Sequence, residues 1–164
     1  MRRARLSGLA LAVLAAVPLA AIDPPREPAP PFRAKSLDGE QFTSASLRGR
    51  VVLLQFWTTW CGYCRRDQPA VEEMIKEFGN RGLVVLAVSV GESKETVTKY
   101  LARSPRTAKI ILTENTNLAA IFQTRGFPLY VLLDRNGLIA GAQPGAGGIE
   151  ALRQLLGRAG LKAE

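Results

Sequence analysis

Cys61 and Cys64 are the only cysteines in the 164-residue chain, and two residues separate them. This spacing places the two side chains about one helical turn apart, within the distance that a disulfide tolerates. Such a pair can open and close without unfolding the surrounding chain. The spacing therefore indicates reversible dithiol–disulfide chemistry.

The position of the cysteines along the chain supports this interpretation. They follow an apolar run, 51–57, and precede a segment with helical periodicity, so we expect them at the amino terminus of a helix. Free amides and the helix dipole stabilise a thiolate at that end. Cys61, which we expect at the exposed end, is predicted to be the nucleophile, and Cys64 is predicted to resolve the mixed disulfide.

Three alternative roles for the cysteines are less well supported. Both could be ordinary core residues, but their position next to a strand end makes burial of both improbable. A purely structural disulfide that closes so short a loop removes little entropy from the unfolded chain. A metal site would need further ligands, and the chain contains no histidine. The lack of histidine also excludes a Ser-His-Asp triad and a histidine-paired cysteine nucleophile. We therefore expect no metal and no cofactor apart from the redox-active disulfide Cys61–Cys64.

The net charge is +8, from 22 basic and 14 acidic residues. Such a surplus can favour nucleic acid, an anionic membrane surface or an acidic partner. The basic residues are scattered, however, with no run of five and no interleaved aromatic residues. This pattern is typical of a solvated surface, and we expect no nucleic-acid partner.

The amino-terminal segment has the composition of an export signal. Three arginines within the first five residues precede an uncharged apolar run over 6–22, which predicts a signal peptide or a membrane anchor over 1–22. Five prolines in 23–31 predict an extended, semi-rigid linker. The folded domain is then expected over 32–164 in the cell envelope, periplasmic or extracytoplasmic. It would be secreted, or attached to the inner membrane through 6–22.

Strands and helices are expected to alternate along the domain. Asp38-Gly39 and Asn136-Gly137 predict two tight hairpin turns. The order of elements predicts an α/β fold with a mixed central sheet and helices on both faces. Strands are expected over 51–57, 83–88, 109–112, 129–133 and 138–142, and helices around 71–78, 97–101, 118–122 and 149–156.

Three motifs carry a resemblance to a known family. Residues 56–64 read Phe-Trp-Thr-Thr-Trp-Cys-Gly-Tyr-Cys, Pro69 follows them, and Gly126-Phe127-Pro128 precedes the strand at 129–133. In these motifs the chain resembles the thioredoxin-like superfamily, specifically the exported TlpA/ResA-type thiol–disulfide oxidoreductases. The resemblance covers essentially the whole domain, including an amino-terminal β-hairpin and an inserted β-α segment at about 109–122.

The resemblance implies a substrate site around the cysteines. Pro128 would be a cis-proline that faces the disulfide, with neighbouring backbone groups available to an extended substrate. Its position alone fits an ordinary proline at the start of a strand equally well. Trp60, Gly62, Tyr63 and Phe127 would contact the substrate. Phe127 is larger than the residue usual in the family, which predicts a bulkier and more apolar groove.

Asp67 matches an acidic position of the ResA-type branch. The resemblance implies that Asp67 adjusts the pKa values of the thiols or transfers a proton. The alternative is that Asp67 is an exposed charge in the first helical turn. Gln55 stands where thioredoxin carries a buried acid, and a glutamine cannot accept a proton from Cys64. Since Gly62-Tyr63 lacks the histidine of strongly oxidising relatives, we predict a reductant.

The predicted partners are a disulfide-bearing protein substrate and a membrane thiol transporter that donates electrons. The resemblance implies substrates such as apocytochrome c or copper-site cysteines. A peroxiredoxin-like peroxidase is one alternative, since Thr58 lies three residues before Cys61, although Leu54 replaces that family's proline. A copper-handling or partner-binding module is the other, although the only methionines are Met1 and Met74.

Overall fold

The computed structural model describes residues 26–163, so the predicted leader over 1–22 lies outside the described residues. Between 26 and 163, no helix has the length and apolar character needed to cross a bilayer. The elements in chain order are β1 (Arg33–Ser36), β2 (Gln41–Thr43), β3 (Val51–Trp57), α1 (Gly62–Phe78), the 3₁₀ helix η1 (Gly79–Arg81), β4 (Leu83–Ser89), α2 (Lys94–Leu101), β5 (Lys109–Thr116), α3 (Leu118–Ile121), β6 (Leu129–Leu133), β7 (Ile139–Pro144) and α4 (Gly148–Gly157).

The strands form one seven-stranded sheet in the order β2-β1-β5-β4-β3-β6-β7. The pairs β3–β4 and β4–β5 are parallel, and the other neighbouring pairs are antiparallel. This arrangement confirms the predicted mixed sheet. β3 lies between β4 and β6, and the chain leaves its carboxyl end directly into the cysteine segment.

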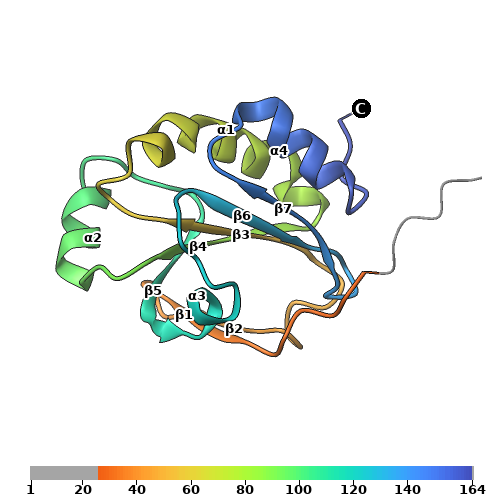
Figure 1. Ribbon diagram of the computed structural model, residues 1–164, viewed down its shortest axis with the longest axis horizontal. Coiled ribbons are helices and arrows are strands. Elements are labelled where there is room, and N and C mark those ends of the chain that lie inside the picture. Colours follow the sequence, from red (N-terminus) through yellow and green to blue (C-terminus); the bar gives the residue numbers. More distant parts are fainter. Residues whose placement is uncertain (1–25, 164) are drawn as a thin grey trace, which may run out of the picture.

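The layers follow from the side-chain pattern of β3, all of whose residues are buried. Val51, Leu53 and Trp57 pack into one apolar cluster with residues of α1 and α4. Val52, Leu54 and Phe56 belong to the cluster on the other face, which includes Leu118 of α3. Figure 1 shows α1 and α4 over one side of the sheet and α3 beyond the other. The prediction of helices on both faces is confirmed.

Most predicted elements lie where the sequence patterns put them, with two notable extensions. β3 and β6 match the expected ranges, whereas β5 continues to Thr116 because its second half pairs with β1. α1 begins at Gly62 and contains Pro69. The turn between β6 and β7 runs from Asp134 to Gly137, whose φ of 69° lies in the left-handed region.

The later part of the proline-rich segment belongs to the folded domain. Residues 26–31, which we call the strap, run along the β6–β7 hairpin and pair with it at Pro28 and Leu138. The Ala29 amide donates to Gly137, and the side chain of Arg26 donates to Asp134 at 3.1 Å. The folded part therefore begins earlier than the expected boundary at residue 32. The composition predicted an extended chain but not the partner for its backbone groups.

Candidate active site

Cys61 caps the amino terminus of α1. Its backbone is extended, and its Sγ atom accepts a 3.0 Å hydrogen bond from the Cys64 amide. The two cysteines form a disulfide, with their Cα atoms 5.3 Å apart. When the disulfide is open, the same amide and the helix dipole stabilise a thiolate on Cys61. This geometry supports the predicted division of roles between the cysteines.

Both cysteines are more buried than expected. Cys61 is 5% exposed and Cys64 is fully buried, so the expectation that the two would not both be buried is wrong. In the disulfide each sulfur shields the other, and both residues belong to the apolar cluster that contains Trp57 and Val71. The remaining exposure belongs to Cys61. An attacking thiolate therefore reaches Cys61 before Cys64.

The segment between β3 and the cysteines is held by Glu92, which lies in the loop after β4. Its carboxylate accepts hydrogen bonds from the Thr59 amide at 2.8 Å and from the Thr59 hydroxyl at 2.5 Å. The Ser89 hydroxyl donates to the same carboxylate at 2.7 Å. One side chain thus fixes the backbone two residues before Cys61.

Aromatic side chains surround the disulfide. Trp60 is 68% exposed and Tyr63 is 61% exposed. The ring of Phe127 meets that of Trp60 edge to face, with centroids 5.9 Å apart. Phe127 is half-buried. The contact brings the segment before β6 next to the segment before α1, as the resemblance implied.

The peptide bond between Phe127 and Pro128 is cis, as the resemblance implied. The Pro128 carbonyl accepts a hydrogen bond from the Gly145 amide at 2.8 Å. Within 26–163, the backbone groups of Phe127 form no hydrogen bond with other backbone groups. These groups are the ones that remain available to an extended segment of another protein.

Asp67 is buried, with 3% exposure, so the alternative of an exposed charge is wrong. Its Oδ2 atom accepts a 2.8 Å hydrogen bond from the Tyr130 hydroxyl, and its Oδ1 atom accepts a 2.7 Å bond from the Gly148 amide. Gln55 approaches the same hydroxyl, with 3.5 Å between its Nε2 atom and the Tyr130 oxygen. These four residues form a polar network in the core beneath the amino-terminal half of α1.

Burial raises the pKa of the Tyr130 phenol above its usual range, and the nearby Asp67 carboxylate adds to this shift. Tyr130 is therefore a constant hydrogen-bond donor at physiological pH. Gln55 Oε1 is buried without a partner in the described chain.

Arg106 lies under the active-site segment. Its guanidinium stacks on the ring of Trp57, 3.5 Å from the ring centroid. Burial lowers the pKa of this guanidinium, against the opposing effect of the Tyr100 hydroxyl. The stacked arginine places a positive charge behind β3, close to the cluster that holds the cysteines.

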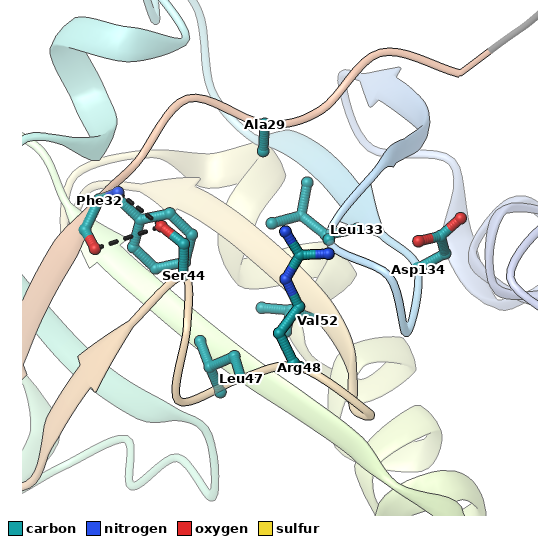
Figure 2. A pocket seen from close by; sticks show the side chains of 9 residues that line it. Ala29, Phe32, Ser44, Leu47, Arg48, Val52, Leu133 and Asp134 are labelled. Carbon is teal, nitrogen blue, oxygen red and sulfur yellow. Dashed lines mark hydrogen bonds between the residues drawn. The ribbon is translucent and has the colours of Figure 1, made fainter.

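A small pocket lies at the other end of the sheet (Figure 2). Val52 near the start of β3 and Leu133 at the end of β6 line it, and the strap residue Ala29 lies over it. The space open to a water-sized probe is about 20 Å³, room for about one water molecule. The pocket is separated from the cysteines by the length of β3 and offers no room for an organic substrate.

Sequence reasoning did not identify Tyr130, Gly148, Glu92 and Arg106. Tyr130 carries the only hydroxyl in the apolar run 129–133, two residues after Pro128, which is a usable signal. Glu92 is the first charged residue after a fully apolar strand. Gly148 and Arg106 carry no sequence signal, because their contacts join segments far apart in the chain.

A family model described as "AhpC/TSA family" matches residues 25–142. The chain belongs to the AhpC/TSA family. The matched region contains both cysteines, Asp67 and Pro128, whereas Gly148, which donates to Asp67, lies beyond it.

Among relatives, this AhpC/TSA chain is 32% identical over 111 residues to "Thiol-disulfide oxidoreductase ResA" of Geobacillus thermodenitrificans. It is 34% identical over 113 residues to "Thioredoxin-like protein YneN" of Bacillus subtilis. Each alignment covers 68% of this chain, and they cover 64% and 66% of the relatives' own lengths, slightly less than two thirds.

A crystal structure of a "thiol:disulfide interchange protein, thioredoxin family protein" from Chlorobium tepidum superposes on 84% of this chain. The TM-score is 0.72, the sequence identity is 25%, and 99% of that chain is covered. The prediction of a thioredoxin-like fold is confirmed.

Proposed function

We propose that this protein is a thiol–disulfide oxidoreductase that reduces disulfides of other proteins. The observation that carries the proposal is the Cys61–Cys64 pair at the start of α1, with the Cys64 amide directed at Cys61 Sγ. The names of the Geobacillus relative and of the Chlorobium structure support the same chemistry. In the part of the chain from 26 to 163, no group of three or more metal-ligating side chains competes with it.

The reaction proceeds by two exchange steps. The Cys61 thiolate attacks one sulfur of the partner's disulfide, forms a mixed disulfide and releases the other sulfur as a thiolate. Cys64 then loses its proton and attacks Cys61 Sγ, which closes the Cys61–Cys64 disulfide and releases the partner's second thiolate. Two electrons pass to the partner, whose two thiolates take up protons.

Asp67 is the candidate acceptor for the Cys64 proton. It lies three positions after Cys64 in α1, one turn along the same side of the helix, and it is buried among apolar residues. Tyr130 and Gly148 hold both of its oxygens in place. A positioned base of this kind speeds the resolving step because it takes the proton without solvent.

Partners and location belong to the same proposal. A protein that works outside the cytoplasm meets disulfides there, and a membrane thiol transporter would return electrons to Cys61 and Cys64. Apocytochrome c and copper-site cysteines are the candidate substrates that the family resemblance implies. The composition of residues 1–22 supports export through a signal peptide or an anchor.

Mixed-disulfide trapping tests the function. A Cys64→Ala variant of the full chain should form a mixed disulfide through Cys61 with a disulfide-bearing protein, and mass spectrometry of the cross-linked peptide should identify Cys61. The matched Cys61→Ala variant should trap nothing. Equivalent trapping by Cys61→Ala alone would reverse the assigned roles. No trapping by either, together with rapid consumption of hydrogen peroxide, would favour the peroxidase alternative.

A further inference from the structure

The surface around the disulfide combines exposed aromatic rings with free positive charge. Trp60 and Tyr63 are the two most exposed large hydrophobic side chains of the described residues. They flank Cys61, one residue before it and two residues after it. Exposed aromatic rings beside a reactive group mark a surface that contacts another protein.

Arg65 and Arg66 stand on the same surface. The Arg65 Nη1 atom donates to the Thr59 carbonyl at 3.1 Å. A Cβ atom on Gly62 would stand 3.8 Å from Arg65 Nη2, so the guanidinium lies against Gly62, the residue after Cys61. The Arg66 guanidinium stacks on the ring of Tyr63, 4.9 Å from its centroid. We call Trp60, Tyr63, Arg65 and Arg66 the basic aromatic rim.

Among residues 26–163, the two positive charges of the rim have no carboxylate partner. The ion pairs formed among residues 26–163 involve other arginines and lysines. The first turn of α1 contains no acidic residue. Of the two acids near the cysteines, Asp67 is buried, and Glu92 accepts hydrogen bonds from Thr59 and Ser89. Both arginines are exposed and available to a ligand.

We propose that the rim binds a partner segment in which acidic residues flank the reacting cysteines. This inference rests on the proposed function and narrows its substrate class. Guanidinium groups bind carboxylates through paired hydrogen bonds, and they do so best when stacking fixes their plane, as Tyr63 does for Arg66. The aromatic rings supply apolar contact beside these charges. Because the charges lie next to Cys61, they accelerate the encounter that precedes exchange.

Two synthetic peptides test the proposal. Each contains one intramolecular disulfide, and they differ only in whether glutamates or lysines flank the two cysteines. The measurement is the second-order rate constant for their reduction by the reduced full chain. We expect the acidic peptide to react at least about tenfold faster at about 0.01 M salt. The two rates should converge at about 1 M salt, where the Debye length falls to about 3 Å.

Variants test whether the preference for the acidic peptide comes from the rim or from the net charge of the protein. Arg66→Glu should abolish or reverse the preference for the acidic peptide, and the milder Arg66→Gln should reduce it. Arg50→Glu is the matched control, since Arg50 is exposed immediately before β3, at the far end of that strand from Cys61. It should keep the preference. Arg50→Glu should also keep the parent rate with uncharged hydroxyethyl disulfide. For the Arg66 variants, each peptide rate is divided by the rate with hydroxyethyl disulfide, so that a general change in thiol reactivity cancels.

The other outcomes distinguish a failure of the proposed partner chemistry from a failure of the proposed function. Equal rates for the two peptides at low salt would overturn the proposed partner chemistry and leave the oxidoreductase function intact. An equal fractional loss with both peptides and with hydroxyethyl disulfide in Arg66→Glu would also overturn it, because the arginine would then act on the thiol and not on the partner. Failure to reduce either peptide or hydroxyethyl disulfide would instead contradict the proposed function.

Discussion

The Tyr130 hydroxyl donates a 2.8 Å hydrogen bond to the carboxylate of Asp67, across 63 positions of sequence. The bond joins β6, which follows the cis-proline, to α1, which carries the cysteines. It therefore ties together the two segments that would contact a substrate. The Gly148 amide holds the other carboxylate oxygen and adds α4 to the same network.

Removal of the Tyr130 hydroxyl should destabilise the domain. In Tyr130→Phe, Asp67 loses a donor while it remains buried, which we expect to lower the free energy of unfolding by about 1–3 kcal/mol. Urea denaturation measures this as a lower midpoint with an unchanged slope. Tyr63→Phe is the control, because Tyr63 is largely exposed, and its midpoint should match that of the parent chain. Equal midpoints for all three proteins would show that the bond contributes nothing to stability.

Asp67→Asn should slow the resolving step. We expect a rate lower by about 100-fold near neutral pH, because the amide cannot accept the Cys64 proton. The deficit should shrink as the pH rises, because hydroxide then removes the proton. Stopped-flow measurement of mixed-disulfide decay over a pH series tests this.

The shape of that pH profile distinguishes proton transfer from a structural role. Asp67→Glu keeps a carboxylate and should recover part of the rate, and Asp38→Asn, in the turn between β1 and β2, should leave the profile unchanged. A uniform loss of rate at every pH in Asp67→Asn would contradict proton transfer by Asp67.

The sequence predicts well what depends on neighbouring residues. β6 is an apolar run and β3 is interrupted only by Gln55, and their ranges follow directly from the pattern. The cap at Cys61 follows from its position between a strand and a helix. The cis-proline was reached only through the resemblance, since a proline before a strand fits either isomer.

What the sequence does not predict depends on distant contacts. The burial of Asp67 requires donors from Tyr130 and Gly148, which lie 63 and 81 positions away. The position of Asp67 in the first turns of a helix fits a solvent-exposed side chain equally well. The strap shows the same limit, because proline content favours extension while its hydrogen bonds are made to Asn117 and to residues beyond 133.

A test of pH dependence comes from the turn between β1 and β2. The Ser36 hydroxyl and then the Lys109 ammonium hold the pKa of Asp38 at about 2, below its usual 3.8. Since the folded value is lower than the unfolded one, the ionised carboxylate favours folding above about pH 4, and this contribution is lost as the pH falls toward 2. Ser36→Ala should raise the pKa of Asp38 toward 3.8, measurable by NMR titration.

Ser46→Ala is the matched control for that titration. The Ser46 hydroxyl bonds to Thr43 and makes no contact with Asp38 in the described chain. Its removal should leave the pKa of Asp38 at about 2. A Ser36→Ala protein with the same titration curve as the parent would show that Lys109 alone holds the carboxylate in its charged form.

Glu92 should control how firmly the segment before Cys61 is held. In Glu92→Ala the Thr59 amide loses its acceptor, a loss we expect to cost about 1–3 kcal/mol locally. The Thr59 amide should then exchange its hydrogen about 5- to 150-fold faster, because every 1.4 kcal/mol is a factor of ten. NMR-detected hydrogen exchange measures this residue by residue.

The control for Glu92 is Glu95→Ala, a change in the first turn of α2 that touches neither Thr59 nor Ser89. It should leave exchange at Thr59 unchanged, and Glu92→Gln, which keeps one acceptor oxygen, should fall between the two alanine variants. If Thr59 is truly held by Glu92, faster exchange should be confined to the residues around Thr59. An increase spread over β4 and α2 would instead mean that Glu92 supports the whole edge of the sheet and has no particular role at the cysteines.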